Sequence, residues 1–447
     1  MIKTKLGKLL CIISSIMILG SVATGCGKKD LSTDAAKQTQ VLDSSKKPED
    51  YKATLKVWGW DDNYFKTMTA EFNKKYPNVK FEYTPVANGD YLQKLQTALA
   101  SGGDVPDILW SIVDSRGRMF ELDTWEVLDK APYNFDKSKV FKYIQPLMVN
   151  SKGDVVGIEQ GVNPAGFAYR RDLAKQYLGS DDPKELKKIL SNWDSFIELG
   201  KQVKQKSGGK IFMLPGMTDA LQILDGQNST PVLENGTLQI TKVYQKSLDY
   251  LVKFRDAGIV NKLDSWSPAW YAAYGQGINI FAGCATWTPQ FVIQPNDKDG
   301  KGKAHWGLMD TPGGNFSWGG TAMGISKASK NKDAAWEFIK FATASKEGGD
   351  AAKKVGFLTS YEEPYKDAEF ASDKNEWFGG QDIGKFFMND VVPSIKVRPM
   401  SQYDNVIHDA LVFVSTDINN NPKMTSEAAL KEFIQEVKNK LPDMKVE

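Results

Sequence analysis

The sequence predicts an α/β fold of two lobes, each built on a mostly parallel sheet flanked by helices. Three observations predict it. The chain has 447 residues, 41% of them hydrophobic, which is enough for two domains with separate cores. Short strand patterns alternate with helical stripes from residue 54 onward. Turn-forming residues at 160–166 and 318–321 interrupt this alternation, and we expect the chain to cross between the lobes there.

Residues 1–25 have the pattern of an export signal. Three lysines lie among the first eight residues, the apolar stretch at 9–19 is too short to span a membrane, and small residues follow it. The Ala-Thr-Gly before Cys26 resembles a bacterial lipobox, in which the thiol receives diacylglycerol and the cysteine becomes the new N-terminus. We therefore expect Cys26 to carry lipid, palmitate included, and to anchor the protein to the outer face of the cell membrane. A plain secretory signal with an incidental cysteine is the alternative.

Residues 26–50 predict a flexible tether. They are rich in Ser, Thr, Asp, Lys and Gln and hold no aromatic residue, so they cannot form a packed core. The three lysines of the signal are the only charged residues in 1–25, so their removal takes the formal net charge from +2 to −1. A near-neutral mature chain argues against a nucleic-acid partner.

Few residues could support metal or nucleophilic chemistry. The chain after the signal holds Cys26 and Cys284 as its cysteines, and His305 and His408 are its histidines. This set offers no disulfide framework and no metal-ligand spacing, so we expect no metal and no cofactor. Nothing in the sequence nominates a catalytic Cys/His or Ser/His pair.

The first lobe begins with a strand–helix–strand–helix–strand pattern. Strand patterns cover 54–60, 79–83 and 104–110, and helical stripes cover 65–72 and 92–99. This order implies a parallel sheet with right-handed crossovers.

The carboxyl ends of these strands carry the first candidate ligand contacts, because open α/β sheets bind ligands beyond those ends. Trp60 ends the first strand, and Asp61 follows it. Trp110 ends the third, and Asp114 and Arg116 come one loop later. Helices cover the faces of such a sheet rather than its ends, so we expect these side chains to reach the ligand. The alternative is that Trp60 or Trp110 caps the core.

The second half of the chain continues the alternation. Residues 167–173 predict a strand that enters a helix, and Asn192 caps a further helix. Strand patterns follow at 210–214 and 277–287, and residues 365–447 are mainly helical.

Several segments together carry a resemblance to a known family. They are Val57-Trp58, Glu71-Phe72, Tyr76-Pro77, 103–107, 167–173, 192–194, 280–287, 326–341 and 356–361. In this order they resemble the bacterial extracellular solute-binding proteins of carbohydrate importers, the maltose-binding type. The resemblance implies a periplasmic-binding-protein-like fold of two lobes, joined by three hinge crossings, that close on a ligand in the cleft between them. It implies no catalytic residues and a partner in the membrane subunits of an ATP-binding cassette (ABC) importer.

The same resemblance divides the chain. It implies a first lobe of residues 51–160 and 319–364 and a second lobe of residues 161–318 and 365–447. We expect the protein to be a monomer.

The residue types near the expected cleft suit a sugar. The C–H face of a pyranose stacks on an indole ring, and its hydroxyls bond carboxylate, amide and guanidinium groups. The predicted ligand-binding residues are Trp60, Asp61, Trp110, Asp114, Arg116, Asn163, Trp287 and Trp318. Several tryptophans favour an oligosaccharide over a monosaccharide, and a β-glucan fragment is one candidate. Trp266 and Trp270 are interpreted as rim contacts or as surface packing.

Two other classes of protein share these features. An extracellular glycoside hydrolase needs two carboxylates that face each other across the scissile bond. The adjacent pairs Asp61-Asp62 and Glu362-Glu363 point in different directions in a regular element, so we expect no enzyme. A surface carbohydrate-binding lipoprotein without a role in transport is the other alternative.

Overall fold

The computed structural model describes residue 42 and residues 45–447. The predicted signal at 1–25, the lipidation of Cys26 and most of the predicted tether at 26–50 therefore lie outside the described residues. None of the described helices combines the length and the apolar character that crossing a membrane requires.

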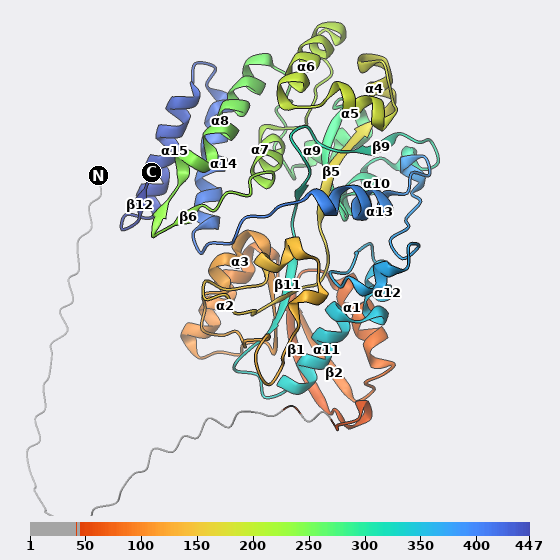
Figure 1. The fold of residues 1–447 in the computed structure, drawn as a ribbon, viewed down its shortest axis with the longest axis vertical. Helices are drawn as coiled ribbons and strands as arrows, with labels where there is room; N and C mark the ends of the chain where they lie inside the picture. Colours follow the sequence, from red (N-terminus) through yellow and green to blue (C-terminus); the bar gives the residue numbers. More distant parts are fainter. Residues whose placement is uncertain (1–41, 43–44) are drawn as a thin grey trace, which may run out of the picture. The chain divides into compact units, whose positions relative to one another are not determined.

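The sheet of the first lobe has the strand order β2-β1-β3-β11-β4 (Figure 1). Its strands are β1 (Ala53–Gly59), β2 (Val79–Pro85), β3 (Ile108–Ile112), β4 (Ile158–Glu159) and β11 (Thr321–Ile325). β1 pairs in parallel with β2 and β3, whereas β11 is antiparallel to β3 and β4. Thr321 at the start of β11 pairs with Ile112 at the end of β3. β11 therefore starts at the edge where β1 and β3 end, because the chain arrives there from the other lobe.

Helices cover this sheet. They are α1 (Asp62–Asn73), α2 (Asn88–Ser101), α3 (Val113–Met119), α11 (Lys332–Ala344) and α12 (Lys346–Lys353). The Asp61 carboxylate caps α1 by accepting a hydrogen bond from the Tyr64 backbone N–H at 2.9 Å. Phe72 of the predicted helical stripe is fully buried, and its ring centroid lies 5.3 Å from that of Phe338 on α11. This packing joins two helices that are far apart in the sequence.

The sheet of the second lobe differs from the prediction. Its strands are β5 (Pro164–Arg170), β8 (Phe281–Ala285), β9 (Trp306–Met309) and β10 (Phe316–Ser317). All three strand pairs, β5 with β8, with β9 and with β10, are antiparallel, so the prediction of a mostly parallel sheet is wrong here. β5 starts at the crossing from the first lobe, and β8 ends there, which forces opposite directions. The strand expected at 210–214 forms only isolated parallel bridges, from Phe212 to Asn279 and from Leu214 to Val260.

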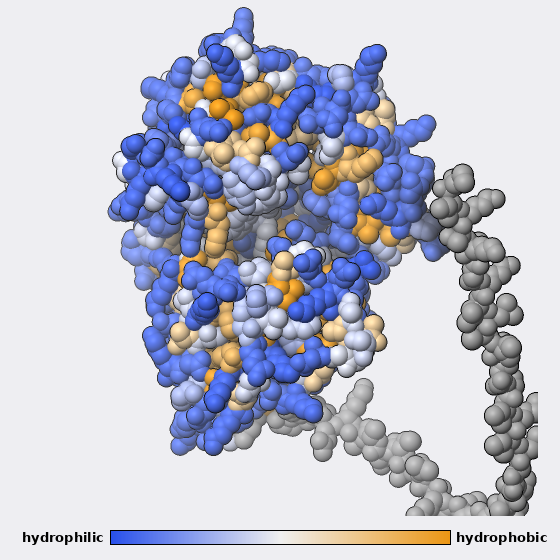
Figure 2. All heavy atoms as spheres, turned by 180° about the vertical axis from the view of Figure 1, so that it is seen from behind, coloured by the Kyte–Doolittle hydropathy of each residue, from blue (hydrophilic) through white to orange (hydrophobic). Residues whose placement is uncertain are grey.

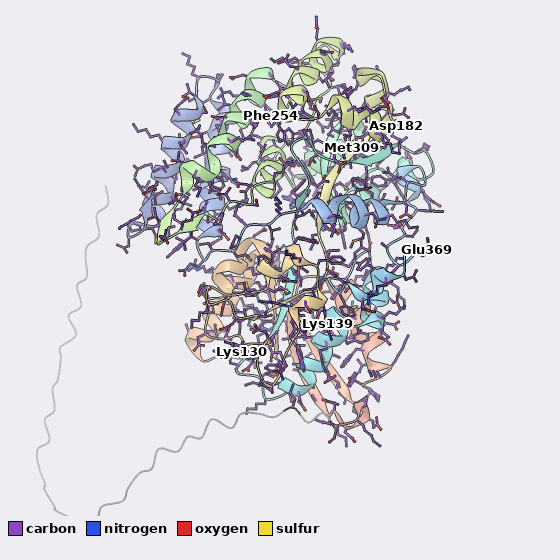
Figure 3. All side chains as sticks on the ribbon, in the orientation of Figure 1. Lys130, Lys139, Asp182, Phe254, Met309 and Glu369 are labelled. Carbon is purple, nitrogen blue, oxygen red and sulfur yellow. The ribbon has the colours of Figure 1, made fainter. Side chains whose placement is uncertain are left out.

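Helices make up most of the second lobe. They are α4 (Arg171–Leu178), α5 (Pro183–Ile189), α6 (Trp193–Ser207), α7 (Met217–Gly226), α8 (Ile240–Ala257), α9 (Pro268–Gln276), α10 (Gln294–Asn296), α13 (Ile383–Lys385), α14 (Asp404–Asn420) and α15 (Ser426–Lys440). Asn192 caps α6 as predicted, since its side chain accepts from the Ser195 N–H at 2.9 Å. Phe254 of α8, labelled in Figure 3, packs its ring against Trp193 at 5.5 Å and forms part of this lobe's core.

Short elements complete the described chain. β6 (Leu233–Glu234), β7 (Thr237–Leu238) and β12 (Lys445–Val446) form a small sheet in the order β12-β7-β6. π-helical turns span Pro289–Ile293 and Phe386–Val391. Turns of 3₁₀ helix span Pro48–Asp50, Lys137–Lys139, Lys142–Leu147, Lys298–Gly300, Glu363–Lys366, Glu376–Phe378 and Val392–Ser394. Residues 365–447 contain no long strand, in agreement with the mainly helical prediction for this stretch of the described chain.

The crossing segments lie side by side and are bonded to one another. They are residues 160–163, 318–320 and 357–360. The Gln160 N–H donates to the Thr321 carbonyl at 2.9 Å, and the Val162 N–H donates to the Leu358 carbonyl at 2.8 Å. A hinge built from a few adjacent backbone segments concentrates any bending there.

Candidate functional site

A cavity with a volume of ≈ 530 Å³ opens between the two lobes, beside the crossing segments. Figure 2 shows the surface receding between the lobes on one face. The cavity is lined by Trp60, Asp61, Asp62, Asn88, Ile112 and Asp114 from the first lobe, by Gln160, Gly161, Asn163, Trp318, Gly319, Gly320, Thr321 and Phe357 at the crossings, and by Thr218, Gln222, Trp266, Trp287, Phe291 and His408 from the second lobe. Its volume is typical of a site for a small molecule.

One wall of the cavity is a cluster of three indole rings, from Trp266, Trp287 and Trp318. The Trp266 and Trp287 ring centroids lie 6.0 Å apart with nearly parallel planes, and the Trp287 and Trp318 centroids lie 4.9 Å apart. The Trp287 indole N–H donates to the Trp318 carbonyl at 3.1 Å, which fixes the orientation of the first ring. Trp266 is the most open of them, with 50% of its surface exposed. The cluster presents broad apolar faces to the cavity.

The opposite wall carries Trp60. Its ring meets the edge of Trp110 at 5.2 Å and of Tyr91 at 5.5 Å, both nearly perpendicular. Edge-to-face contacts of this kind hold a ring in one orientation. Phe291, 42% exposed, and Phe357 lie 6.0 Å apart at the crossing side of the cavity. Aromatic rings from both lobes therefore line the same space.

Polar groups line the same cavity as these rings. Asp61, Asp62 and Asp114 bring carboxylates, and Asn163 and Gln222 bring amides. One Asp61 oxygen is used as the cap of α1, and burial raises the pKa of this carboxyl above its ordinary value. The lining set contains no lysine and no arginine.

Trp110 does not reach the cavity. It is fully buried, and it lies inside β3, where it pairs with Met323 of β11. The prediction for Trp110 fails because β3 continues to Ile112, two residues beyond the expected end of the strand. Ile112 therefore lines the cavity in place of Trp110, and the buried Trp110 ring packs edge to face against the Trp60 ring.

Arg116 is also displaced from the predicted contact set. It is fully buried and pairs with the Glu159 carboxylate. Its guanidinium donates to the carbonyls of Ser111 at 3.0 Å and Gly320 at 2.9 Å. Arg116 thus ties the end of β3 to a crossing segment. A further bond to the Leu147 carbonyl at 3.2 Å gives its two outer nitrogens four acceptors in all.

Six of the eight predicted contacts line the cavity, namely Trp60, Asp61, Asp114, Asn163, Trp287 and Trp318. Trp266, Phe291 and Phe357 line it as well and were not in the predicted set. The sequence signal for Trp266 was its place in a turn-rich stretch with other aromatic residues, which fits a rim contact as well as surface packing.

Other chemistry finds little support in the described residues. They hold no group of three or more His, Cys, Asp or Glu side chains arranged to bind a metal ion. Cys284 is fully buried, and burial raises the pKa of its thiol well above its ordinary value, so it is not a nucleophile.

Comparison with known proteins decides the family. Residues 59–349 match the family model of the bacterial extracellular solute-binding proteins. The chain belongs to this family. As an extracellular solute-binding protein it is similar to the lactose-binding protein of Rhizobium radiobacter, with 26% identity over 312 residues that cover 65% of this chain and 70% of that protein.

Two further comparisons agree with the fold described above. The arabinooligosaccharide-binding protein of Bacillus subtilis (strain 168) is 24% identical over 351 residues, which cover 76% of this chain and 77% of that protein. The crystal structure of an extracellular solute-binding protein family 1 member has a TM-score of 0.78 at 23% identity and covers 87% of this chain and 99% of its own. The two-lobed fold of this solute-binding protein is therefore that of the family.

Proposed function

We propose that this solute-binding protein captures an oligosaccharide in the cleft and delivers it to the membrane subunits of an ABC importer. The observation that carries the proposal is the convergence of Trp60 from the first lobe with Trp266 and Trp287 from the second lobe and Trp318 from the return crossing, in a cavity that carboxylates also line. Indole faces stack on pyranose C–H groups, and carboxylates bond hydroxyls strongly in a closed cleft. The names of the two similar proteins above, which refer to lactose and an arabinooligosaccharide, support a sugar as the ligand.

The charge of the cavity indicates an uncharged sugar. Asp61, Asp62 and Asp114 line it, and no lysine or arginine does. The guanidinium of Arg116, which acts on Asp114, is buried against Glu159 behind the cavity wall. The neighbouring cavity of ≈ 140 Å³ contains Arg398, but this guanidinium is paired with Asp225 at 2.7 Å. A uronate or an aldonate would place its own charge beside these carboxylates, which opposes binding.

The finer proposal for the ligand is a β-glucan fragment, because a flat chain of β-linked residues presents its faces to flat rings. Several aromatic platforms in a cavity of ≈ 530 Å³ support a ligand of more than one sugar residue. Cellotriose therefore belongs in the test panel with lactose and α-1,5-arabinotriose.

Calorimetric titration tests the proposal. We expect at least one of the three neutral sugars to bind with a micromolar or lower Kd, and lactobionate, which is lactose oxidised to the acid, to bind at least about 10-fold more weakly than lactose if lactose binds. The sugar should be recovered intact after incubation, as a binding protein requires and a hydrolase does not. Failure of every neutral oligosaccharide to bind would overturn the proposal.

We also propose that Cys26 anchors a monomeric protein to the outer face of the membrane through its lipid. In cells grown with an alkyne fatty acid, the wild-type protein should become labelled and stay in the membrane fraction. Cys26→Ser should lose the label and appear in the medium, because two or more acyl chains supply the anchoring. Cys284→Ser is the matched control, since this thiol is buried, and it should behave as the wild type. Equal membrane recovery of Cys26→Ser would contradict the anchor.

A further inference from the structure

Trp266 adopts a backbone conformation that is unusual for a bulky residue. Its φ angle is +69°, in the left-handed region that favours glycine. Strained conformations of this kind persist where the surrounding structure imposes them, and they concentrate at functional sites. Trp266 is half exposed to the cavity, so burial of its own ring does not impose the conformation. Contacts of its neighbours must do so.

Those contacts converge on a single carboxylate in α7. Asp219 accepts a hydrogen bond from the Ser265 hydroxyl at 3.0 Å and from the Trp270 indole N–H at 3.0 Å. Ser265 directly precedes Trp266, and the Trp270 ring packs against the Trp266 ring at a tilt of 44°, with ring centroids 5.0 Å apart. Asp219 therefore holds the chain by hydrogen bonds on both sides of Trp266.

The backbone on the other side of this turn is fitted closely to the start of α7. The Leu263 N–H donates to the Pro215 carbonyl at 3.2 Å, and a Cβ atom on Gly216 would approach the Leu263 carbonyl oxygen to 2.3 Å. Such an approach is possible only for glycine. The turn is thus seated on the segment that also carries Asp219.

The arrangement is unfavourable for stability by itself. Asp219 is 6% exposed, and no ion pair with a lysine, arginine or histidine reaches it within the part of the chain that the structure describes. Burial raises the pKa of Asp219 to about 6, although the bonds from Trp270 and Ser265 act in the other direction. A buried carboxylate without a cation lowers stability, and sites where local rules are broken tend to be functional.

We infer that Asp219 is a positioning residue that holds Trp266 against the Trp287 and Trp318 rings, so that the second-lobe wall is already assembled when the sugar arrives. The inference rests on the proposed function, because it takes Trp266 as a ligand contact. Asp219 acts through the two hydrogen bonds that its carboxylate accepts from Ser265 and Trp270. These bonds fix the Trp266 turn before the ligand binds, and such preorganisation of a site raises its affinity.

Two substitutions at this position separate the role from a general loss of structure. Asp219→Ala removes both acceptors and should weaken binding of the tightest sugar among lactose, cellotriose and α-1,5-arabinotriose by about 10-fold or more. Asp219→Asn keeps an acceptor for Trp270 and offers an N–H to the Ser265 oxygen, so its affinity should stay within about 3-fold of the wild type. An Asp219→Ala protein that binds as tightly as the wild type would overturn the inference.

Asp297 provides a matched control. It is also a buried carboxylate that accepts from an indole N–H, that of Trp306 at 2.8 Å, but it does not line the cavity. Asp297→Ala should lower the melting temperature and leave the Kd unchanged. A comparable loss of affinity in both alanine variants would mean that the effect is one of fold stability and would contradict the positioning role.

A measurement without ligand keeps the inference independent of the proposed function. The near-UV circular dichroism difference between the wild type and Trp266→Phe reports the fixed environment of the Trp266 ring. The same difference taken in an Asp219→Ala background should largely vanish, and in an Asp219→Asn background it should remain. If the circular dichroism difference survives in the Asp219→Ala background, the positioning role of Asp219 is overturned, even when no sugar binds. If the difference is lost and no sugar binds, the proposed function alone is overturned.

Discussion

At the residue scale, burial divides the tryptophans of this protein into platforms and supports. Trp60 and Trp110 meet edge to face at 5.2 Å, yet the first lines the cavity and the second is fully buried behind it. In the other lobe, Trp266 lines the cavity and packs at a tilt against Trp270, which is fully buried. The exposed ring of each pair is available to a ligand, and the buried ring fixes its orientation. The sequence alone does not distinguish the tryptophan that lines the cavity from the one that is buried behind it.

Among the tryptophans that line the cavity, Trp287 is the one whose removal should weaken sugar binding most. Trp287→Ala removes the centre of the second-lobe wall, and we expect the Kd for the neutral sugar to rise roughly 10- to 100-fold. Its melting temperature should change little, because the ring is only partly buried. Trp336→Ala is the control, since this ring is 4% exposed and is not part of the cavity lining; the variant should lose about 3–5 kcal/mol of stability and keep its affinity. Calorimetry and urea unfolding of both variants check this. Equal Kd values for wild type and Trp287→Ala would contradict the platform role.

Asp219 predicts a pH dependence of stability. Its carboxyl has a pKa of about 6 in the folded protein and an ordinary value of 3.8, so the folded state binds the proton more tightly than the unfolded state does. The Asp219 carboxylate therefore lowers the free energy of unfolding by its full amount above pH 6, and this effect is absent below pH 3.8. Asp219→Asn should therefore raise the free energy of unfolding at pH 7.5, by up to about 3 kcal/mol, and this gain should shrink as the pH falls to 4.5. A gain that is the same at both pH values would contradict the buried charge.

At the element scale, the ends and directions of strands decide which predictions succeed. The predicted Asn192 cap of α6 follows from local chemistry and is confirmed, and the Asp61 cap of α1 has the same local origin. The two-residue extension of β3 to Ile112 depends on its pairing with β11, more than 200 residues later, and it moves Trp110 out of the cavity. The antiparallel second sheet depends on where the chain crosses between lobes. Trp266 was ambiguous because its position depends on a left-handed backbone that no hydrophobic pattern signals.

The return crossing requires a glycine at position 320. Its φ is +132°, and a Cβ atom there would lie 2.8 Å from the Glu159 carboxylate and 3.2 Å from the Asn163 amide. Gly320→Ala should lower stability by more than the roughly 1–3 kcal/mol of backbone strain, and it should weaken sugar binding because the crossing lines the cavity. Gly314→Ala is the matched control, with a φ of +117° but open space around the added atom. Urea unfolding should show the smaller loss for Gly314→Ala; the reverse order would refute the steric account.

At the scale of the whole molecule, one buried guanidinium connects elements that meet at the junction of the two lobes. Arg116 of α3 contacts Glu159 at the end of β4 and the carbonyl of Gly320 at the start of β11. Removing one partner of a buried ion pair leaves the other uncompensated and is strongly destabilising. The crossings and this ion pair lie at the junction of the two lobes, where we expect the molecule to bend, and aromatic rings from both lobes line the cavity beside them. We expect bending at this junction to bring the aromatic walls of the two lobes toward each other.

Ligand binding should be visible in the whole molecule. Saturating neutral sugar should decrease the radius of gyration in small-angle X-ray scattering, because the lobes close around it. It should also raise the free energy of unfolding by about 2.7 kcal/mol when the sugar is present at 100 times its Kd. Lactobionate at the same concentration should produce a smaller shift. A radius of gyration that stays constant while the melting temperature rises would contradict hinge closure. It would mean that the sugar binds to a form of the protein that is already closed.

The inert thiol in β8 has a practical consequence. Cys284 is fully buried with a raised pKa, so a maleimide dye will not compete for it in the folded protein. With Cys26 replaced by serine, cysteines introduced at the exposed positions Lys139 of the first lobe and Lys184 of the second would be the reactive ones. A donor and an acceptor fluorophore attached there would convert lobe movement into an optical signal. The molecule is thus a ready scaffold for a reagentless sugar sensor.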